Sequence, residues 1–294
     1  KDQPQRISLI IPTRDRREPL RRCLQAATRQ DYPDVEIIAV DDGSTDGTQG
    51  MVCAEFPQVR CLRQDRRQGP AAARNQGIAA ATGEIIAFTD DDCIPPSDWL
   101  TLLAAGLAAY PQAAAVGGVQ EPPPEVLRQS ILARYEYAVT RRWYGLGERA
   151  VWGRPAPGGT NNLAVPRAFL QRIGGFDESF PVAAGEDTDL LRRLAGTGKM
   201  TVTLPVPVAH WGAYTWRGFW RQQVRRGVGS VHFGRKWGRA LTRRRELLRF
   251  TLMPLIIARD LRRLGSLELW LPLAVGRYAQ AIGRWQALAS TRAV

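Results

Sequence analysis

The sequence has little cysteine and little histidine. Its 294 residues include four cysteines and two histidines. No two cysteines form a CxxC pair, and no histidine cluster lies near them. This pattern disfavours a zinc site and predicts reduced, cytosolic thiols, although a bridge between Cys53 and Cys61 stays open. Residues 1–6 are polar and lead straight into a predicted strand, with no signal-peptide pattern.

Long apolar runs are also missing. The longest apolar stretches, around residues 252–258 and 269–275, are interrupted by Pro254 and Pro272. They fall well short of the ~20 apolar residues that a membrane-spanning helix needs. No GxGxxG motif follows the first predicted strand, which disfavours a dinucleotide-dependent oxidoreductase. The hydrophobic content of 44% and the charged content of 23% are those of an ordinary globular protein.

Acidic residues are scarce in the last quarter of the chain. Residues 217–294 contain 17 Lys and Arg but three Asp and Glu, whereas residues 1–216 are almost neutral and the whole chain carries +13. Such an asymmetry predicts two parts with different partners. We therefore expect one domain over residues 1–216 and a basic, amphipathic, mostly helical region over residues 217–294.

Short apolar runs alternate with helix-like segments in the first part. The predicted strands cover residues 8–11, 36–40, 59–62, 84–89 and 114–116, and a helix-like segment lies between each pair. This alternation predicts an α/β fold with a mainly parallel central sheet flanked by helices. Ligands bind such sheets at the carboxyl ends of the strands. Farther along, we expect one helix over residues 125–144 and a strand over residues 162–165.

The sequence contains three clusters of acidic residues. Asp41 and Asp42 follow one predicted strand, residues 90–92 are three aspartates that follow another, and residues 185–189 open a helix. Adjacent carboxylates repel one another, and Mg²⁺ or Mn²⁺ bridging to substrate phosphates is their natural counter-charge. Each cluster also has a structural alternative, either a capping or solvated turn or acids that the helix dipole favours.

Taken in order, these clusters resemble the family 2 glycosyltransferases, which are inverting enzymes of the GT-A fold. The resemblance extends over residues 7–212 and also includes the sequence IIPT at 10–13, GPAAARN at 69–75 and GGFDE at 174–178. It implies a GT-A catalytic domain with a Rossmann-like sheet. The nucleotide-sugar half would cover about residues 1–118, and the acceptor half about residues 119–216.

The resemblance also implies which residues bind the nucleotide sugar. Pro12 and Thr13 would line the nucleotide pocket, and Asp42 would accept a hydrogen bond from the base. The remaining members of this set are Arg74 near the nucleotide, Asp90 near the ribose, and Asp91 within the DxD element.

Three further residues would bind the cation and carry out the chemistry. Asp92 would be the direct ligand of a divalent cation, and His210 would complete the metal shell; the alternative for His210 is a core or surface histidine. Asp187 would be the general base that takes the proton of an acceptor hydroxyl. The implied reaction is a single displacement that inverts the anomeric centre.

The acceptor side is predicted from weaker features. The candidate acceptor-binding residues are Asn161, Glu186, Trp152, Gln222 and Arg225. Trp152 could stack on a sugar ring or pack in the core. Residues 222–226 resemble the QxxRW element of processive members, but Arg226 replaces the tryptophan, so processivity is doubtful.

The expected partners follow from these features. The donor would be a nucleoside-diphosphate sugar, with UDP favoured, and the acceptor a saccharide that is lipid-linked or membrane-associated. Basic residues interleaved with Trp and Leu predict peripheral attachment to the anionic cytoplasmic face of the cell membrane. The alternative is a helical appendage with a solvated basic face.

Two other functions compete with this interpretation. A nucleic-acid-binding protein fits the sequence pI of 10.4, but the acids of the neutral first domain would repel phosphate, so we expect no nucleic-acid partner. A sugar nucleotidyltransferase has a similar sheet, but its Gly-rich first loop with Arg and Lys is missing after Ile11.

Overall fold

The computed structural model describes residues 4–143, 151–153, 159–212, 214–239 and 241–290. The chain divides into two compact units. The first unit comprises residues 1–121, 146–178 and 187–211, and the second comprises residues 122–145, 179–186 and 212–294. The helices of the basic C-terminal region therefore share a unit with two segments from the middle of the chain.

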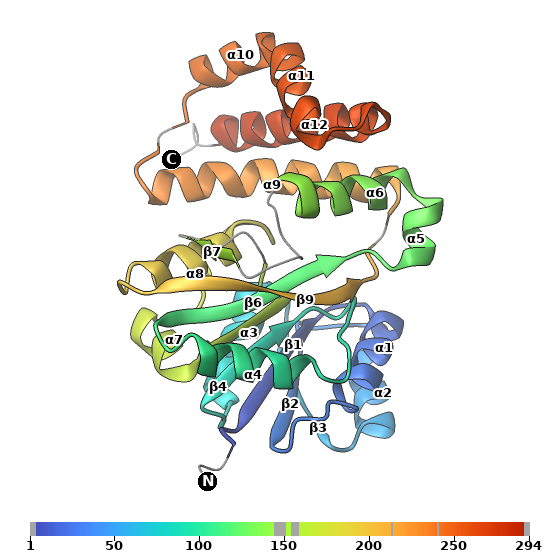
Figure 1. Cartoon of the computed structure of the whole chain (residues 1–294), viewed down its shortest axis with the longest axis vertical. Helices are drawn as coiled ribbons and strands as arrows, with labels where there is room; N and C mark the ends of the chain where they lie inside the picture. The colour runs from blue at the N-terminus through green and yellow to red at the C-terminus, as the bar shows by residue number, and fades with distance from the viewer. Residues whose placement is uncertain (1–3, 144–150, 154–158, 213, 240, 291–294) are drawn as a thin grey trace. The chain divides into compact units, whose positions relative to one another are not determined.

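The first unit contains a mixed sheet whose amino-terminal strands are parallel. Strands β3 (Val59–Arg63), β2 (Val35–Asp41), β1 (Ile7–Thr13) and β4 (Ile85–Thr89) lie side by side in that order (Figure 1). Connecting helices follow them in the chain: α1 (Arg17–Ala27), α2 (Thr48–Glu55) and α3 (Pro70–Ala80). Parallel strands need such crossover connections, and the predicted α/β alternation is confirmed.

Alternate side chains of β1 enter two different cores, because helices cover both faces of the sheet. Leu9 and Ile11 pack in one core with residues from α1, α2 and α4 (Trp99–Ala109). Ile10 packs in the other core with residues from α3, α7 (Arg167–Ile173) and α8 (Glu186–Ala195). Burial on both faces accounts for the nearly continuous apolar runs in the sequence.

The rest of the sheet mixes strand directions. Strand β8 (Asn162–Pro166) is antiparallel to both β4 and β6 (Ala113–Glu121), and β6 is parallel to β9 (Met200–His210). The short strands β5 (Cys93–Ile94) and β7 (Val151–Gly153) each pair antiparallel with β9. The predicted strand over residues 162–165 is confirmed.

One predicted helix is interrupted. The sequence pattern over residues 125–144 predicts one helix, but the structure has α5 (Pro124–Gln129), then α6 (Ile131–Ala138), then a π-helical turn, η1 (Val139–Trp143). Ser130 lies between α5 and α6 in an extended conformation, and its Oγ accepts a hydrogen bond from the amide of Ala133. The single-helix prediction is wrong because Ser130 caps a second helix; residue 144 lies outside the described part.

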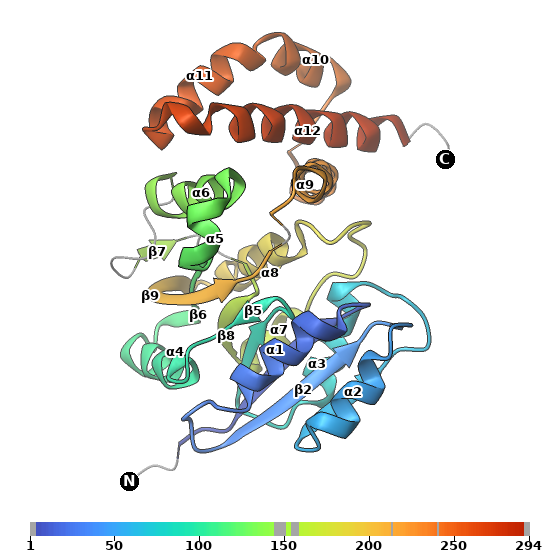
Figure 2. The same ribbon diagram turned by 90° about the vertical axis from the view of Figure 1, so that its right-hand side faces the viewer.

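The C-terminal part of the second unit is helical, as predicted. It contains α9 (Trp216–Lys236), α10 (Arg243–Thr251), α11 (Met253–Leu264), a 3₁₀ turn η2 (Leu267–Leu269) and α12 (Trp270–Ala289). In both views, α12 lies between α9 and the α10–α11 pair (Figures 1 and 2). Among the described residues, no helix has both the length and the apolar composition that crossing a bilayer requires.

Glycines allow α9 and α12 to pack closely. A Cβ atom placed on Gly227 of α9 would lie 2.2 Å from the carbonyl oxygen of Gln280, and one on Gly283 of α12 would lie 2.1 Å from that of Val224. Real Cβ atoms do not approach backbone so closely, so these positions require glycine. In the first unit, Cys53 and Cys61 are not bridged, and the other two cysteines are also free.

Candidate functional site

The carboxyl ends of β1 and β4 bring two predicted residues together. Thr13 ends β1 and Thr89 ends β4, so the three aspartates that follow Thr89 lie at the same edge of the sheet as Thr13. The Thr13 hydroxyl donates a hydrogen bond of 2.8 Å to Oδ2 of Asp91, and both side chains are buried. Pro12, one residue earlier, is buried in β1 opposite Val40 of β2.

An arginine that the sequence analysis missed contacts two of the aspartates. Arg16 precedes α1, and its Nη2 lies 2.8 Å from Oδ2 of Asp92, while its Nε lies 3.3 Å from Oδ1 of Asp91. These residues are more than 70 positions apart in the chain, so no local pattern links them. The one available signal is a basic residue in the loop that directly follows β1, where ligands of parallel sheets bind.

The two neighbouring carboxyl groups differ in their protonation. Burial raises the pKa of Asp91 to about 7, and the attraction of Arg16 opposes that rise. Burial also acts to raise the pKa of Asp92, but His210 and Arg16 overcome it and hold that pKa well below its usual range. Asp92 therefore keeps its negative charge at neutral pH, whereas Asp91 takes up a proton at a higher pH than Asp92 does.

His210 reaches Asp92 because β9 returns to this edge of the sheet. Cys93, the residue after Asp92, pairs with His210, and the amide of Trp211 donates a 2.8 Å hydrogen bond to the carbonyl oxygen of Asp92. Nε2 of His210 then lies 3.5 Å from Oδ2 of Asp92. Within the described ranges, no three His, Cys, Asp or Glu side chains form a group that could hold a metal ion.

Arg74 and Asp90 form a second charged pair at this edge. Nη2 of Arg74, in α3, lies 2.7 Å from Oδ1 of Asp90. The Arg74 side chain is almost fully buried, and its guanidinium lies over the ring of Phe176, 5.4 Å from the ring centre. Asp90 is about one-third exposed and is the most accessible of the three aspartates.

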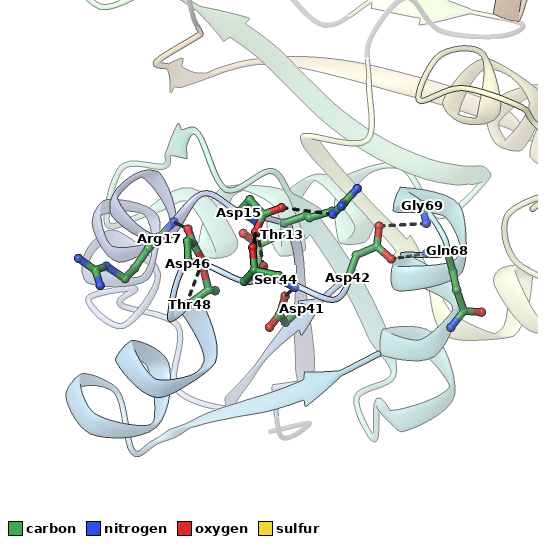
Figure 3. Close-up of polar contacts among 12 residues, drawn as sticks. Thr13, Asp15, Arg17, Asp41, Asp42, Ser44, Asp46, Thr48, Gln68 and Gly69 are labelled. Carbon is green, nitrogen blue, oxygen red and sulfur yellow. Dashed lines mark hydrogen bonds and ion pairs between the residues drawn. The ribbon is translucent and has the colours of Figure 1, made fainter. Parts of the chain in front are cut away.

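Asp42 lies at the end of β2 and binds backbone amides. Its Oδ1 accepts a 2.5 Å hydrogen bond from the amide of Gln68, and its Oδ2 accepts one of 3.0 Å from Gly69, just before α3 begins (Figure 3). Asp42 thus fixes the loop that leads into α3. Its predicted hydrogen bond with a nucleotide base stays a prediction.

A second set of hydrogen bonds, also missed by the sequence analysis, joins the loops after β1 and β2. The amide of Asp15 donates to Oγ of Ser44 at 2.8 Å, and the amide of Thr45 donates back to Oδ1 of Asp15 at 2.7 Å. The amide of Arg17 donates to Oδ2 of Asp46 at 2.9 Å (Figure 3). Asp15 has φ of 49°, a strained conformation for a residue other than glycine. These contacts hold the two loops together.

Asp187 and Asn161 extend the same edge toward β8. A Cβ atom placed on Gly159 would lie 3.6 Å from Oδ2 of Asp187 and 3.2 Å from Oδ1 of Asn161. The Thr89 hydroxyl in turn donates a 3.0 Å hydrogen bond to the carbonyl oxygen of Asn161. Asp187 is partly exposed, and its Oδ1 accepts a 2.7 Å hydrogen bond from the amide of Thr188.

The other predicted acceptor residues are divided between the two units. Glu186, Gln222 and Arg225 belong to the second unit, where Glu186 is buried, Gln222 half-buried and Arg225 exposed. Trp152 lies in β7, where its backbone pairs with Val202, and its side chain lies outside the described part of the structure. Their roles stay predictions.

Known proteins with similar sequences are glycosyltransferases. The glycosyltransferase AglE of Haloferax volcanii is 40% identical over 99 residues, which cover 32% of this chain and 33% of that protein. The pre-mycofactocin glycosyltransferase of Mycobacterium tuberculosis is 30% identical over 216 residues, which cover 69% of this chain and 42% of the relative. The matched region thus spans a third to less than half of these two relatives.

A solved structure and a family model agree with these matches. The structure of the mannosyltransferase PcManGT from Pyrobaculum calidifontis, in complex with GDP-Man and Mn²⁺, has a TM-score of 0.64 and 26% sequence identity, and the match covers 99% of this chain and 76% of that one. The family model described as glycosyl transferase family 2 matches residues 8–168, more than half of the chain. The chain belongs to glycosyl transferase family 2, and its fold is of the GT-A type.

Proposed function

We propose that this chain transfers a sugar from a nucleoside-diphosphate donor to a hydroxyl group of a saccharide acceptor, with the help of a divalent cation. The observation that supports the proposal is the cluster of Thr13, Asp91, Asp92 and His210 at the carboxyl edge of the sheet, with Asp187 at the same edge. The similarity to a mannosyltransferase that binds GDP-Man and Mn²⁺ makes GDP a candidate beside the UDP favoured by the sequence analysis.

Asp92 and His210 suit a divalent cation of the Mn²⁺ or Mg²⁺ type. A charged carboxylate oxygen and an imidazole nitrogen 3.5 Å apart leave the remaining coordination positions to water and substrate phosphates. Small divalent cations are commonly bound in this way, by one or two protein ligands together with a diphosphate. A bound cation would neutralise the negative charge that develops on the leaving diphosphate.

The positive charge of Arg16 balances the negative charge of Asp91 and Asp92, as a bound cation would. Its guanidinium contacts both Asp91 and Asp92 and must give up at least part of these contacts when a cation binds. Once displaced, a guanidinium next to a diphosphate binding site can pair with phosphate oxygens. We therefore assign Arg16 to the donor site.

Replacing Arg16 by methionine is expected to strengthen the binding of Mn²⁺ alone by about tenfold, because a positive charge next to the cation ligands is removed. Arg17→Met is the matched control, since Arg17 pairs with Glu18 and not with the aspartates. The measurement is a titration with Mn²⁺ followed by the electron paramagnetic resonance signal of the free ion. Equal or weaker Mn²⁺ binding by Arg16→Met contradicts the competition between arginine and cation.

Asp187 is the general base in this proposal. The oxygen of the acceptor hydroxyl forms a bond to the anomeric carbon, and its proton passes to Asp187. The bond between the anomeric carbon and the diphosphate oxygen breaks, and the nucleoside diphosphate leaves on the opposite face. Asn161 lies beside Asp187 and can orient the acceptor. A single displacement of this kind inverts the anomeric centre.

The stereochemistry of the product tests this mechanism. UDP-glucose and GDP-mannose are both α-linked donors, and each is incubated with the full chain, Mn²⁺ and a panel of saccharide acceptors. Nuclear magnetic resonance of the new glycosidic bond is expected to show a β-linkage for whichever donor is used. An α-linked product excludes a single displacement, and the absence of transfer from every nucleoside-diphosphate sugar would refute the proposed activity.

We also propose that the chain works at the cytoplasmic face of the cell membrane, on an acceptor that is lipid-linked or membrane-associated. The basic, aromatic-rich helices of the second unit support this location, because such helices bind anionic lipid surfaces. Residues 217–294 account for the net positive charge of the chain, because their 17 Lys and Arg are accompanied by three Asp and Glu.

A further inference from the structure

Helices α10 and α11 expose large apolar side chains. The exposed fractions are 58% for Leu247, 59% for Leu248, 42% for Leu252 and 69% for Leu255. These residues lie within nine positions that span the junction of the two helices. Among the described residues of the first unit, by contrast, Leu102 is the one large apolar residue in the exposed class. Apolar exposure in this protein is therefore concentrated in the second unit.

The same two helices bury their acidic side chains. Glu246 of α10 is 3% exposed and its Oε2 lies 2.6 Å from Nε of Arg284, whereas Asp260 of α11 is fully buried and its Oδ2 lies 2.6 Å from Nη2 of Arg277. Both arginines belong to α12. The two acids thus face α12, and the leucines do not. Met253 and Leu264 of α11 are also buried, so the four leucines are exposed in addition to the apolar residues that face inward in the usual way.

Basic residues accompany the exposed leucines. Arg244 and Arg245 near the start of α10, and Arg259, Arg262 and Arg263 in α11, are exposed. Glu246 and Asp260 are the acidic residues of these two helices, and both are buried. The exposed side chains of α10 and α11 therefore combine leucines with arginines and include no acid.

We propose that this surface of α10 and α11 binds an anionic lipid bilayer. Leu247, Leu248, Leu252 and Leu255 enter the boundary between headgroups and acyl chains, and the arginines pair with lipid phosphates. The inference deepens the proposed membrane location and rests on it, but it does not depend on sugar transfer. It identifies which surface contacts the membrane.

Charge and polarity favour a bilayer over a nucleic acid or a second copy of the chain as the partner of this surface. A nucleic acid would pair with the arginines but would leave the leucines in water. A second copy of the chain, bound symmetrically, would bring the same arginine-rich surface against itself, and like charges in such a contact repel. A bilayer with anionic lipids meets both the apolar and the basic residues.

Co-sedimentation of the full chain with vesicles tests this surface. Wild type is expected to bind vesicles of phosphatidylcholine mixed with phosphatidylglycerol, and to bind vesicles of pure phosphatidylcholine much less. Leu255→Glu is expected to reduce binding to the anionic vesicles by about tenfold or more, because it replaces an inserted leucine by a charge. Leu102→Glu, an exposed leucine of the first unit, is the matched control and is expected to bind like wild type.

The results of these experiments distinguish a bilayer from a second copy of the chain, and they distinguish the membrane-surface proposal from the sugar-transfer proposal. The proposal that this surface binds a membrane is refuted if wild type does not bind anionic vesicles, or if Leu255→Glu binds them as well as wild type. Light scattering that shows a dimer of the wild type and a monomer of Leu255→Glu would also overturn it, in favour of a second copy. Titration of both variants with GDP and Mn²⁺ shows whether donor binding persists, so a failure here is distinct from a failure of the sugar-transfer proposal.

Discussion

Replacing Asp187 by asparagine is expected to lower the rate of sugar transfer by about 10²- to 10⁴-fold, the usual contribution of a general base. Asparagine has nearly the same shape but accepts no proton, so the acceptor hydroxyl stays a weak nucleophile. Binding of the nucleoside diphosphate is expected to stay near that of wild type, because Asp187 is assigned to the acceptor hydroxyl and not to the cation or the diphosphate. Steady-state rates and calorimetric affinities measure the two effects separately.

The control for this experiment is the same substitution at an exposed aspartate. Asp34 precedes β2 at the opposite edge of the sheet and pairs with Arg6 at the surface. Asp34→Asn is expected to transfer sugar at the wild-type rate. If Asp187→Asn also keeps a rate within a fewfold of wild type, Asp187 is not the base, and the partly exposed carboxylate has a structural role at the start of α8.

Removing Asp92 is expected to have the second large effect. In Asp92→Ala, the affinity for a nucleoside diphosphate in the presence of Mn²⁺ is expected to fall by about 100-fold or more, since loss of residues that merely support a metal ligand already costs 10- to 100-fold. The physical reason is that His210 alone is left to bind the cation, while Arg16 stays paired with Asp91. Calorimetric titration with GDP and UDP measures the change.

Asp98→Ala is the matched control for Asp92→Ala. Asp98 lies six residues farther along the chain, is exposed, and makes no side-chain hydrogen bond to the start of α4. Asp92→Asn serves as a second variant that keeps the shape of the side chain. Thermal melting confirms that each variant is folded, and an unchanged affinity in folded Asp92→Ala and Asp92→Asn would contradict the assignment of Asp92.

Much of the first unit could be predicted from the sequence because its signals are local. The apolar runs of β1, β2 and β4 each precede polar residues, and parallel strands joined by helices must end at the same edge of the sheet. The meeting of Thr13 with Asp91 follows from this rule. Comparison with known proteins establishes membership of family 2. This membership favours a glycosyltransferase over the nucleic-acid-binding protein and the nucleotidyltransferase that the sequence left open.

Other features could not be predicted, because they depend on distant residues or on exceptions to local rules. Strand β9 contains Pro205 and Pro207, which lack the amide hydrogen of a regular ladder, so its sequence does not read as a central strand. Arg16 lies in the loop after β1, and its contact with Asp92 forms because the fold brings the residues that follow β4 close to that loop.

The interleaved Trp, Leu and basic residues predicted a membrane-binding region, but the sequence did not show which side of α10 and α11 is exposed. The sequence shows leucines and arginines at helical spacing, and such spacing usually predicts that the leucines face the core. The packing of Glu246 and Asp260 against arginines of α12, together with the exposed fractions of the four leucines, shows that the leucines are left outside. The direction in which an amphipathic helix faces is decided by its neighbours.

The most direct test of the proposed site is calorimetric titration of the wild-type chain with GDP and with UDP, each with and without Mn²⁺. We expect at least one of the two to bind when Mn²⁺ is present. Its affinity is expected to fall steeply when the metal is chelated, because the diphosphate then meets Asp90, Asp91 and Asp92 without a bridging cation. Binding of equal strength without metal, or no binding of either nucleotide with it, would contradict the central claim.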